Sequence, residues 1–192
     1  MIEHNVEQKS LEWFKLRELK MTASEAQAIG NNGKGLESYI TKIMATFYSG
    51  GGDEKYSNEK MERGNEYEGF AREIYELKQG VNVREVGFIE IDENLGCSPD
   101  GLIEDDGLLE IKSCNYIKHY EMIRDGKPDS KYVWQCQMQL FLTGRKWCDL
   151  VYYHPNFKEN LVIFRIEPDE EKFEKLKLGI EKGKKLISEQ LK

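Results

Sequence analysis

The stretch from Gly96 to Ser113 constrains the fold of this chain more than any other part of the sequence. Two runs rich in β-forming residues, Gly96–Ile103 and Leu108–Ser113, flank the acidic turn Glu104-Asp-Asp-Gly107. A turn ending in Asp-Gly between two such runs is typical of a β-hairpin, because these residues adopt the tight turn that joins antiparallel strands. We therefore expect a hairpin here, with the rest of a sheet built around it.

Charged side chains lie on one face of that hairpin. Because side chains alternate along a strand, Glu110 and Lys112 share one face while Leu109 and Ile111 point into the core. The first arm can bring Asp100 to the same edge. The sequence thus predicts that two carboxylates and an ammonium group lie together among apolar neighbours.

The remaining pattern predicts helices, then strands, then mixed elements, so the fold class is α/β of the α+β kind, with a central mixed sheet flanked by helices. A length of 192 residues suits one domain better than two. We expect a single domain, 1–192, with its core at about 11–167 and a C-terminal helix at about 168–191.

Helices are predicted from Ser10, from a capping box at Thr22-Ala-Ser-Glu25, and over about 37–47, 58–78, 116–124, 131–142 and 170–191. Strands are predicted over about 83–91, 147–154 and 161–167. The apolar anchors expected in these helices are Leu11, Phe14 or Trp13, and Leu19; then Tyr67, Phe70, Ala71, Ile74 and Leu77; then Phe173, Leu176, Ile180, Ile187 and Leu191.

Composition narrows the kind of metal site that the chain can hold. Its four cysteines are far apart with no CxxC pair, which favours free thiols over a four-thiolate zinc or iron–sulfur site. Its three histidines form no HExxH or paired set. Any metal is therefore expected to have oxygen ligands, which favours magnesium, manganese or calcium.

Charge and hydropathy say less about function. The net charge of −7 argues against broad non-specific binding to nucleic acid, but it does not exclude a DNA enzyme with one basic groove. No apolar run approaches the roughly 20 residues of a membrane span. Residues 1–8 are too polar for a signal peptide, so we expect a cytoplasmic protein, in the host cytoplasm if it is phage-encoded, with no membrane partner.

The predicted cluster of Asp100, Glu110 and Lys112 fits one chemistry well. Hydrolysis of a phosphodiester needs cations to neutralise the scissile phosphate and an activated water. Asp and Glu oxygens hold magnesium, and a lysine one strand-step away can orient or deprotonate that water, more easily if burial lowers its pKa. The alternative is an exposed ion pair on a strand, worth well under ~1 kcal/mol.

Five blocks, in order, resemble one nuclease family. They are Trp13-Phe-Lys-Leu-Arg17, Thr22-Ala-Ser-Glu25, Gly64-Asn-Glu-Tyr-Glu68-Gly-Phe-Ala-Arg72, Cys97-Ser-Pro-Asp-Gly101 with Glu110-Ile-Lys112, and Tyr132-Val-Trp-Gln135-Cys-Gln137. Pro99-Asp100 with Glu110-Ile-Lys112 resembles the PD-(D/E)xK signature of restriction-endonuclease-like cores. The whole set resembles the phage lambda exonuclease group, the YqaJ-type viral recombinases.

The resemblance implies roles for individual residues. It makes Asp100, Glu110, Glu68 and the Ile111 carbonyl metal ligands, and it places Lys112 at the nucleophilic water. It also places Gln135 beside the metal centre, with Tyr132 one helical turn away. Arg17, Ser24, Ser98 and Tyr132 would bind the terminal 5′-phosphate or the DNA, and Lys118 would be a basic DNA contact. Without the resemblance, Glu68, Gln135, Arg17 and Lys118 would be ordinary surface side chains.

The resemblance further implies a magnesium-dependent 5′→3′ exonuclease on linear double-stranded DNA, with two ions per active site and manganese as a substitute. Such an enzyme releases 5′-mononucleotides, leaves a 3′ single strand, forms a ring-shaped homotrimer, and acts with a single-strand annealing protein in phage recombination. Its channel would be lined by Lys118, Arg124, Lys127 and Lys131. The stretch from Ser24 to Ser38 is shorter than in lambda exonuclease, which leaves the splitting of the duplex end open. The alternatives are another PD-(D/E)xK endonuclease and a non-catalytic DNA-binding scaffold.

Overall fold

The computed structural model describes residues 1–51 and 58–192, with the side chains of 58–66 outside that description. Its central element is a five-stranded mixed sheet in the order β3-β6-β7-β8-β9. The predicted hairpin forms its middle, and the pair β7 and β8 runs parallel while the other neighbours are antiparallel. The strands are β3 (Val83–Arg84), β6 (Gly101–Ile103), β7 (Gly107–Ser113), β8 (Trp147–Tyr153) and β9 (Leu161–Ile166).

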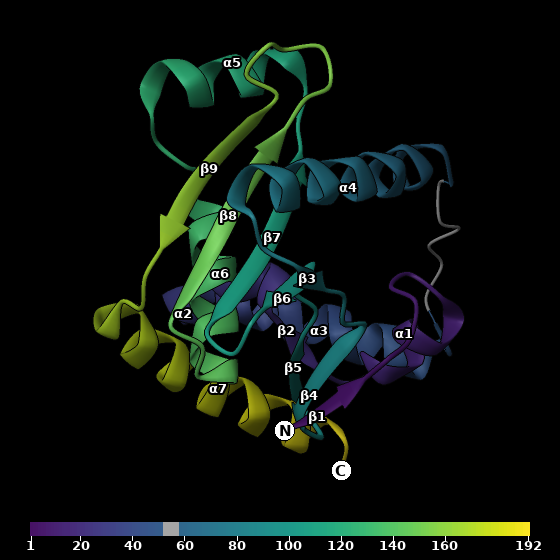
Figure 1. Ribbon diagram of the computed structural model, residues 1–192. Helices are drawn as coiled ribbons and strands as arrows, with labels where there is room; N and C mark the ends of the chain where they lie inside the picture. The colour runs from purple at the N-terminus through teal and green to yellow at the C-terminus, as the bar shows by residue number, and fades with distance from the viewer. Residues whose placement is uncertain (52–57) are drawn as a thin grey trace.

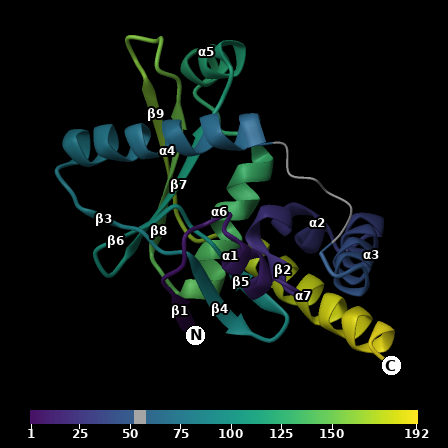
Figure 2. The ribbon, with the colours of Figure 1, turned by 90° about the vertical axis from the view of Figure 1, so that its right-hand side faces the viewer.

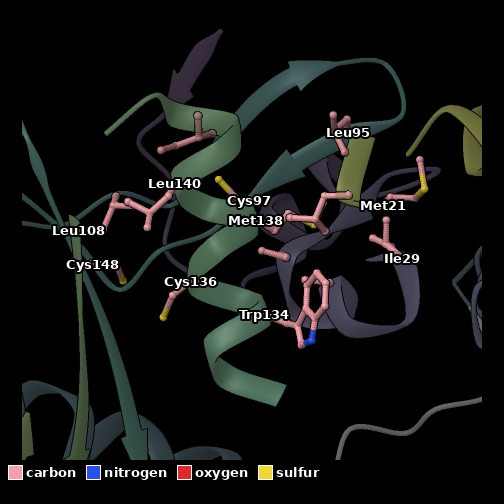
Figure 3. Close-up of a cluster of buried hydrophobic side chains, with 14 of the residues drawn as sticks. Met21, Ile29, Leu95, Cys97, Leu108, Trp134, Cys136, Met138, Leu140 and Cys148 are labelled. Atoms are coloured by element: carbon pink, nitrogen blue, oxygen red, sulfur yellow. The ribbon is translucent and has the colours of Figure 1, made fainter. Parts of the chain in front are cut away.

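Helices cover both faces of this sheet (Figures 1 and 2). Helix α4 (Asn58–Gln79) packs Ala71 and Tyr75 onto one face, in a small apolar core with Leu109 and Ile111. Helix α6 (Ser130–Thr143) covers the opposite face, where the larger core lies. Figure 3 shows α6 in this core, with Cys148 of β8 on one side of the helix and Ile29 on the other. The central strands are therefore buried on both faces, as expected of parallel strands in a mixed sheet.

Two strands predicted as single units are each divided between two sheets. The run 83–91 forms β3 and then β4 (Phe88–Asp92), and these belong to different sheets. The break is at Gly87, where a Cβ atom would lie 2.1 Å from the Val6 carbonyl oxygen, so only glycine allows the two segments to approach. The run 96–103 is likewise divided around Pro99, which cannot donate to a strand ladder.

The second sheet has the order β1-β4-β5-β2 and contains the N-terminal segment. Besides β4 it consists of β1 (Ile2–His4), β2 (Met21–Thr22) and β5 (Leu95–Cys97). Strand β5 ends just before Ser98 and Pro99, and β6 begins after Asp100. The Pro-Asp corner therefore lies at the junction of the two sheets.

The other predicted helices are present with slightly different ends. They are α1 (Leu11–Leu16), the 3-10 helix η1 (Ala23–Glu25), α2 (Ala26–Asn31), α3 (Lys34–Tyr48), α5 (Tyr116–Asp125) and α7 (Glu170–Gln190). Helix α7 packs against α2, α3 and α6 along the lower edge in Figure 1. It approaches α2 closely because Gly179 leaves no side chain: a Cβ there would lie 1.9 Å from the Ile29 carbonyl oxygen.

Several predicted anchors were wrong. Leu11, Phe70, Leu77 and Leu191 are 83%, 49%, 85% and 44% exposed. In α4 the contacts with the sheet are made by Ala71 and Tyr75, four residues apart, so the apolar stripe is rotated away from Phe70 and Leu77.

In the described part of the chain, none of the helices combines the length and the apolar character that a membrane crossing requires.

Candidate active site

A cleft of about 300 Å³ lies where β5, β7, α1, α4 and α6 meet. Its lining includes every predicted site residue except Lys118 and Tyr132. The predicted residues that line it are Arg17, Ser24, Glu68, Ser98, Asp100, Glu110, Ile111, Lys112 and Gln135. Residues up to about 118 positions apart in the sequence thus share one concave surface, which is where a ligand site is expected.

Asp100 is placed by the start of the hairpin. Its backbone N–H donates to the Leu109 carbonyl at 3.0 Å, and its Oδ2 accepts from the Ile111 N–H at 2.6 Å. Burial, together with the nearby carboxylates of Glu110 and Glu68, raises the pKa of Asp100 well above its ordinary value, while Lys112 opposes this. The site therefore concentrates negative charge that a cation would stabilise.

Glu110 is almost fully buried, with 2% of its surface exposed. The alternative of an exposed ion pair therefore does not apply to Glu110, because α6 covers its face of the strand. Gln135 Nε2 and Lys112 Nζ both lie 2.6 Å from Glu110 Oε1, and Gln139 Nε2 donates to Oε2 at 2.6 Å. Gln139 was not predicted. Its spacing of four residues from Gln135, which puts both on one helix face, was the signal that could have identified it.

Lys112 completes the group of charges on β7. Its Nζ also lies over the ring of Tyr132, 4.6 Å from the ring centre, which places Tyr132 beside the cleft although it does not line it. Burial disfavours the charge of Lys112, but Glu110 and Asp100 outweigh it and raise its pKa. The condition that burial lowers the pKa of Lys112 is therefore not met in this structure.

Glu68 lies between two cations that the sequence did not single out. Lys9 Nζ is 3.5 Å from its Oε2, and Arg72 is 3.7 Å from its Oε1, one helical turn further along α4. Arg72 also pairs with Glu85. Lys9 has φ of 70°, in the left-handed region that residues other than glycine seldom adopt. Lys9 thus reaches Glu68 from a left-handed backbone position.

The donor set suits a hard divalent cation. Asp100 and Glu110 offer carboxylate oxygens, and Ile111 lines the same cleft. Within the described residues, no three side chains of His, Cys, Asp or Glu converge closely enough to hold an ion alone. Magnesium commonly takes only one or two carboxylates and fills its other positions with water and phosphate, so this set fits it. A cation that recruits Glu68 would compete there with Lys9 and Arg72.

The opposite corner of the cleft is built around Arg17. Its guanidinium stacks on Trp13, 4.0 Å from the ring centre, and donates to Ser98 Oγ at 3.4 Å and to Thr22 Oγ1 at 3.1 Å. Trp13 Nε1 also donates to Ser98 Oγ, at 2.9 Å. Thr22 Oγ1 lies 3.2 Å from Ser24 Oγ. The corner therefore presents a fixed guanidinium and hydroxyl groups, a set suited to a phosphate.

The predicted capping box at Thr22–Glu25 does not form. Thr22 precedes the 3-10 helix, but its side chain makes no capping hydrogen bond. Its hydroxyl contacts Arg17, Ser24 and Tyr39 instead. The Thr22 side chain thus contacts the Arg17 corner of the cleft and does not cap the helix.

Lys118 lies outside the cleft. It lies in the first turn of α5, 3.6 Å from Glu121 and 3.7 Å from Asp129. Arg124 pairs with Asp125. The proposed channel cations therefore lie on α5, on the segment after it and at the start of α6, outside the lining of the cleft, and two of them are paired with acidic groups.

Comparison with known proteins identifies the family. A model of the YqaJ-like viral recombinase domain matches residues 12–146. The chain belongs to this family. The fold is similar to that of an alkaline exonuclease from Laribacter hongkongensis, which superimposes with a TM-score of 0.84 at 33% identity, over 94% of each chain. The same exonuclease in complex with dAMP gives a TM-score of 0.84 at 34% identity, again over 94% of each chain.

A more distant structure agrees on the fold alone. A phage-related exonuclease from Haemophilus somnus 129PT superimposes with a TM-score of 0.67 at 14% identity, over 92% of this chain and 97% of that one. Among proteins with curated function, none matches the chain. Family and fold together support a nuclease of the lambda exonuclease type with a PD-(D/E)xK core.

Proposed function

We propose that this protein is a magnesium-dependent 5′→3′ exonuclease that degrades one strand of linear double-stranded DNA from a 5′ end. It releases 5′-mononucleotides and leaves a 3′ single strand. The observation that carries the proposal is that the Arg17 corner and the Asp100–Glu110–Lys112 group line one cleft of about 300 Å³. A cleft of this size accommodates a terminal nucleotide between a phosphate clamp and a hydrolytic centre.

In this proposal Asp100, Glu110 and the Ile111 carbonyl hold a divalent cation, magnesium or in its place manganese, and Glu68 completes a second position. When bound, the cation neutralises charge on the scissile phosphate and lowers the pKa of water. Lys112 positions the attacking water as an ammonium donor, a role that its raised pKa supports. Gln135 holds Glu110 through a hydrogen bond of 2.6 Å.

Recognition of the 5′ end rests on Arg17. Its stacking on Trp13 and its contact with Ser98 fix the guanidinium, so a terminal phosphate meets a preorganised donor. Ser24 adds a hydroxyl at the same corner. A strand that enters with its 5′-phosphate in this corner presents its next phosphodiester toward the carboxylates, which supports the 5′→3′ direction.

We further propose that residues 1–192 form a single exonuclease domain that assembles as a homotrimeric ring around DNA. The partner would be a single-strand annealing protein in phage recombination, acting in the cytoplasm. A ring needs basic residues only along its channel, which reconciles DNA binding with the net charge of −7. Lys118, Arg124, Lys127 and Lys131 remain the candidates for that channel.

The test is digestion of a linear duplex labelled separately at its two 5′ ends, one end phosphorylated and the other not, beside a closed circle. Lys112→Ala should lower the rate by on the order of 10²–10³-fold, the range expected for loss of a group that acts on a transferred proton or its water. Arg17→Ala should abolish the preference for the phosphorylated end, at a cost of roughly 10–100-fold there.

Arg84→Ala serves as the matched control, because Arg84 is an exposed arginine paired with Glu3 outside the cleft. It should leave both rates unchanged. Cleavage of the closed circle, or full activity in Lys112→Ala, would contradict the proposal.

A further inference from the structure

The two oxygens of the Glu110 carboxylate face different surroundings. Oε1 contacts Gln135 and Lys112, and both of these residues line the cleft. Oε2 accepts from Gln139, which is fully buried and does not line the cleft. A cation that enters from the cleft therefore meets Oε1, while Oε2 is held on the inner side of the strand.

Gln139 is itself held in one orientation. Its Oε1 accepts a weak hydrogen bond from the buried thiol of Cys148 at 4.0 Å, and its Nε2 donates to Glu110. Burying an amide without hydrogen-bond partners costs free energy. Both ends of the Gln139 amide have partners in this orientation, so its Nε2 is the end that faces the carboxylate. The chain from Cys148 through Gln139 to Glu110 runs from β8 across α6 to β7.

We propose that Gln139 is a positioning residue that keeps Glu110 a one-oxygen ligand, and that it thereby makes the site select magnesium over calcium. The inference rests on the proposed function and identifies Gln139 as the residue that determines the metal preference of the site. Calcium takes six to eight oxygen ligands and often binds both oxygens of one carboxylate, whereas magnesium requires octahedral geometry with short bonds. Because Gln139 holds Oε2 on the buried side, only Oε1 lies beside the cleft, and binding one ion through both oxygens would require the carboxylate to turn and lose the Gln139 hydrogen bond.

A purely structural role for Gln139 makes a different prediction. If the amide only satisfied a buried carboxylate, its loss would weaken the binding of both ions equally, because the whole site would loosen. If it restricts Glu110 to one oxygen, its loss frees Oε2 and favours calcium relative to magnesium. The ratio of the two dissociation constants therefore separates the two roles.

The experiment is isothermal titration calorimetry of the full chain with magnesium chloride and with calcium chloride, without DNA. The variant is Gln139→Met, which keeps the length of the side chain in an apolar environment but removes the donor. The magnesium affinity should fall by about tenfold, the usual cost of losing a group that orients a metal ligand. The calcium affinity should hold or rise, so the selectivity ratio should fall at least tenfold.

Thr143→Val is the matched control, because Thr143 Oγ1 donates to the backbone carbonyl of Gln139 and leaves its side chain untouched. It should leave the ratio at the wild-type value. Gln139→Asn gives a second variant if Gln139→Met does not fold: it keeps the amide but is one methylene too short to reach Oε2, and it should lower the ratio in the same direction.

Parallel loss of both affinities, or an unchanged ratio in a folded Gln139 variant, would overturn the inference while leaving the nuclease proposal intact. Wild-type protein that binds neither ion and does not cleave DNA would overturn both.

Discussion

Lys9 and Glu68 both line the cleft and form an ion pair there, with 3.5 Å between Nζ and Oε2, and the backbone of Lys9 has a φ of 70°. A cation that recruits Glu68 has to compete with this ammonium group. Replacing Lys9 with alanine should therefore tighten magnesium binding. A pair of this partial exposure contributes under ~1 kcal/mol after solvent screening, so the gain should stay below roughly fivefold. Calorimetry with magnesium chloride measures it.

Lys9→Gly separates the charge from the backbone. Lys9→Gly should bind magnesium like Lys9→Ala, because both remove the charge. Glycine adopts positive φ without steric cost, so the free energy of unfolding of Lys9→Gly should be about 1 kcal/mol higher than that of Lys9→Ala. Urea denaturation of the two variants gives that difference. Equal stability of the two would mean that the positive φ is not strained, and weaker magnesium binding in both would mean that Lys9 assists the site.

The raised pKa of Asp100 predicts how stability depends on pH without metal. Because the folded protein holds this proton more tightly than the unfolded chain, the free energy of unfolding should fall as pH rises from about 4 through the raised pKa. Asp100→Asn should remove that part of the slope. Urea denaturation in the presence of a chelator, at several pH values, tests this.

Magnesium should act in the opposite direction at the same group. Its binding displaces the proton from Asp100, so its affinity should rise with pH over the same window. Calorimetry in two buffers with different heats of ionisation would reveal proton release on binding. An affinity that does not change with pH would mean that Asp100 is already ionised in the metal-free protein.

The sequence predicted the part of the site that depends on local geometry. Glu110 and Lys112 share a face because side chains alternate along a strand, and this holds wherever the strand lies in the fold. The acidic turn that ends in Asp-Gly predicted the hairpin, because its residues adopt the tight turn that joins antiparallel strands. The break at Gly87 was missed, because it results from the approach of Val6, which is distant in the sequence.

Two of the residues that the sequence analysis missed act through tertiary contacts. Gln139 and Lys9 have ordinary residue types, and each contacts a predicted site residue only after the chain has folded. Arg72 differs, because it is four residues from Glu68 on α4, and that helical spacing is visible in the sequence. Burial of Glu110 likewise depends on α6, so no pattern within β7 could show it.

A buried network outside the lining of the cleft gives a stability prediction with no effect on catalysis. Tyr75 of α4 donates to Asp149 Oδ2 at 2.6 Å, and Arg165 holds the same carboxylate from β9. Tyr75→Phe removes one donor from a buried carboxylate and should lower the free energy of unfolding by about 1–3 kcal/mol. Tyr48→Phe is the control, because its hydroxyl contacts the Gln190 carbonyl at the surface, and it should change stability by under ~0.5 kcal/mol. Thermal and urea unfolding, with a nuclease assay alongside, measure both.

Trp13 tests whether the phosphate corner is preorganised. Trp13→Phe keeps an aromatic face for Arg17 but removes the Nε1 donor that holds Ser98 Oγ and the Gly87 carbonyl. Ser98 is then free to turn, so Arg17 loses one of its fixed neighbours. The KM for 5′-phosphorylated duplex ends should rise by roughly fivefold, the value of one hydrogen bond, while 5′-hydroxyl ends should be cleaved as before. Steady-state kinetics on the two substrates measure this. A drop in kcat of equal size on both ends would instead mean that Trp13 supports the carboxylates, and that the corner does not recognise the terminal phosphate.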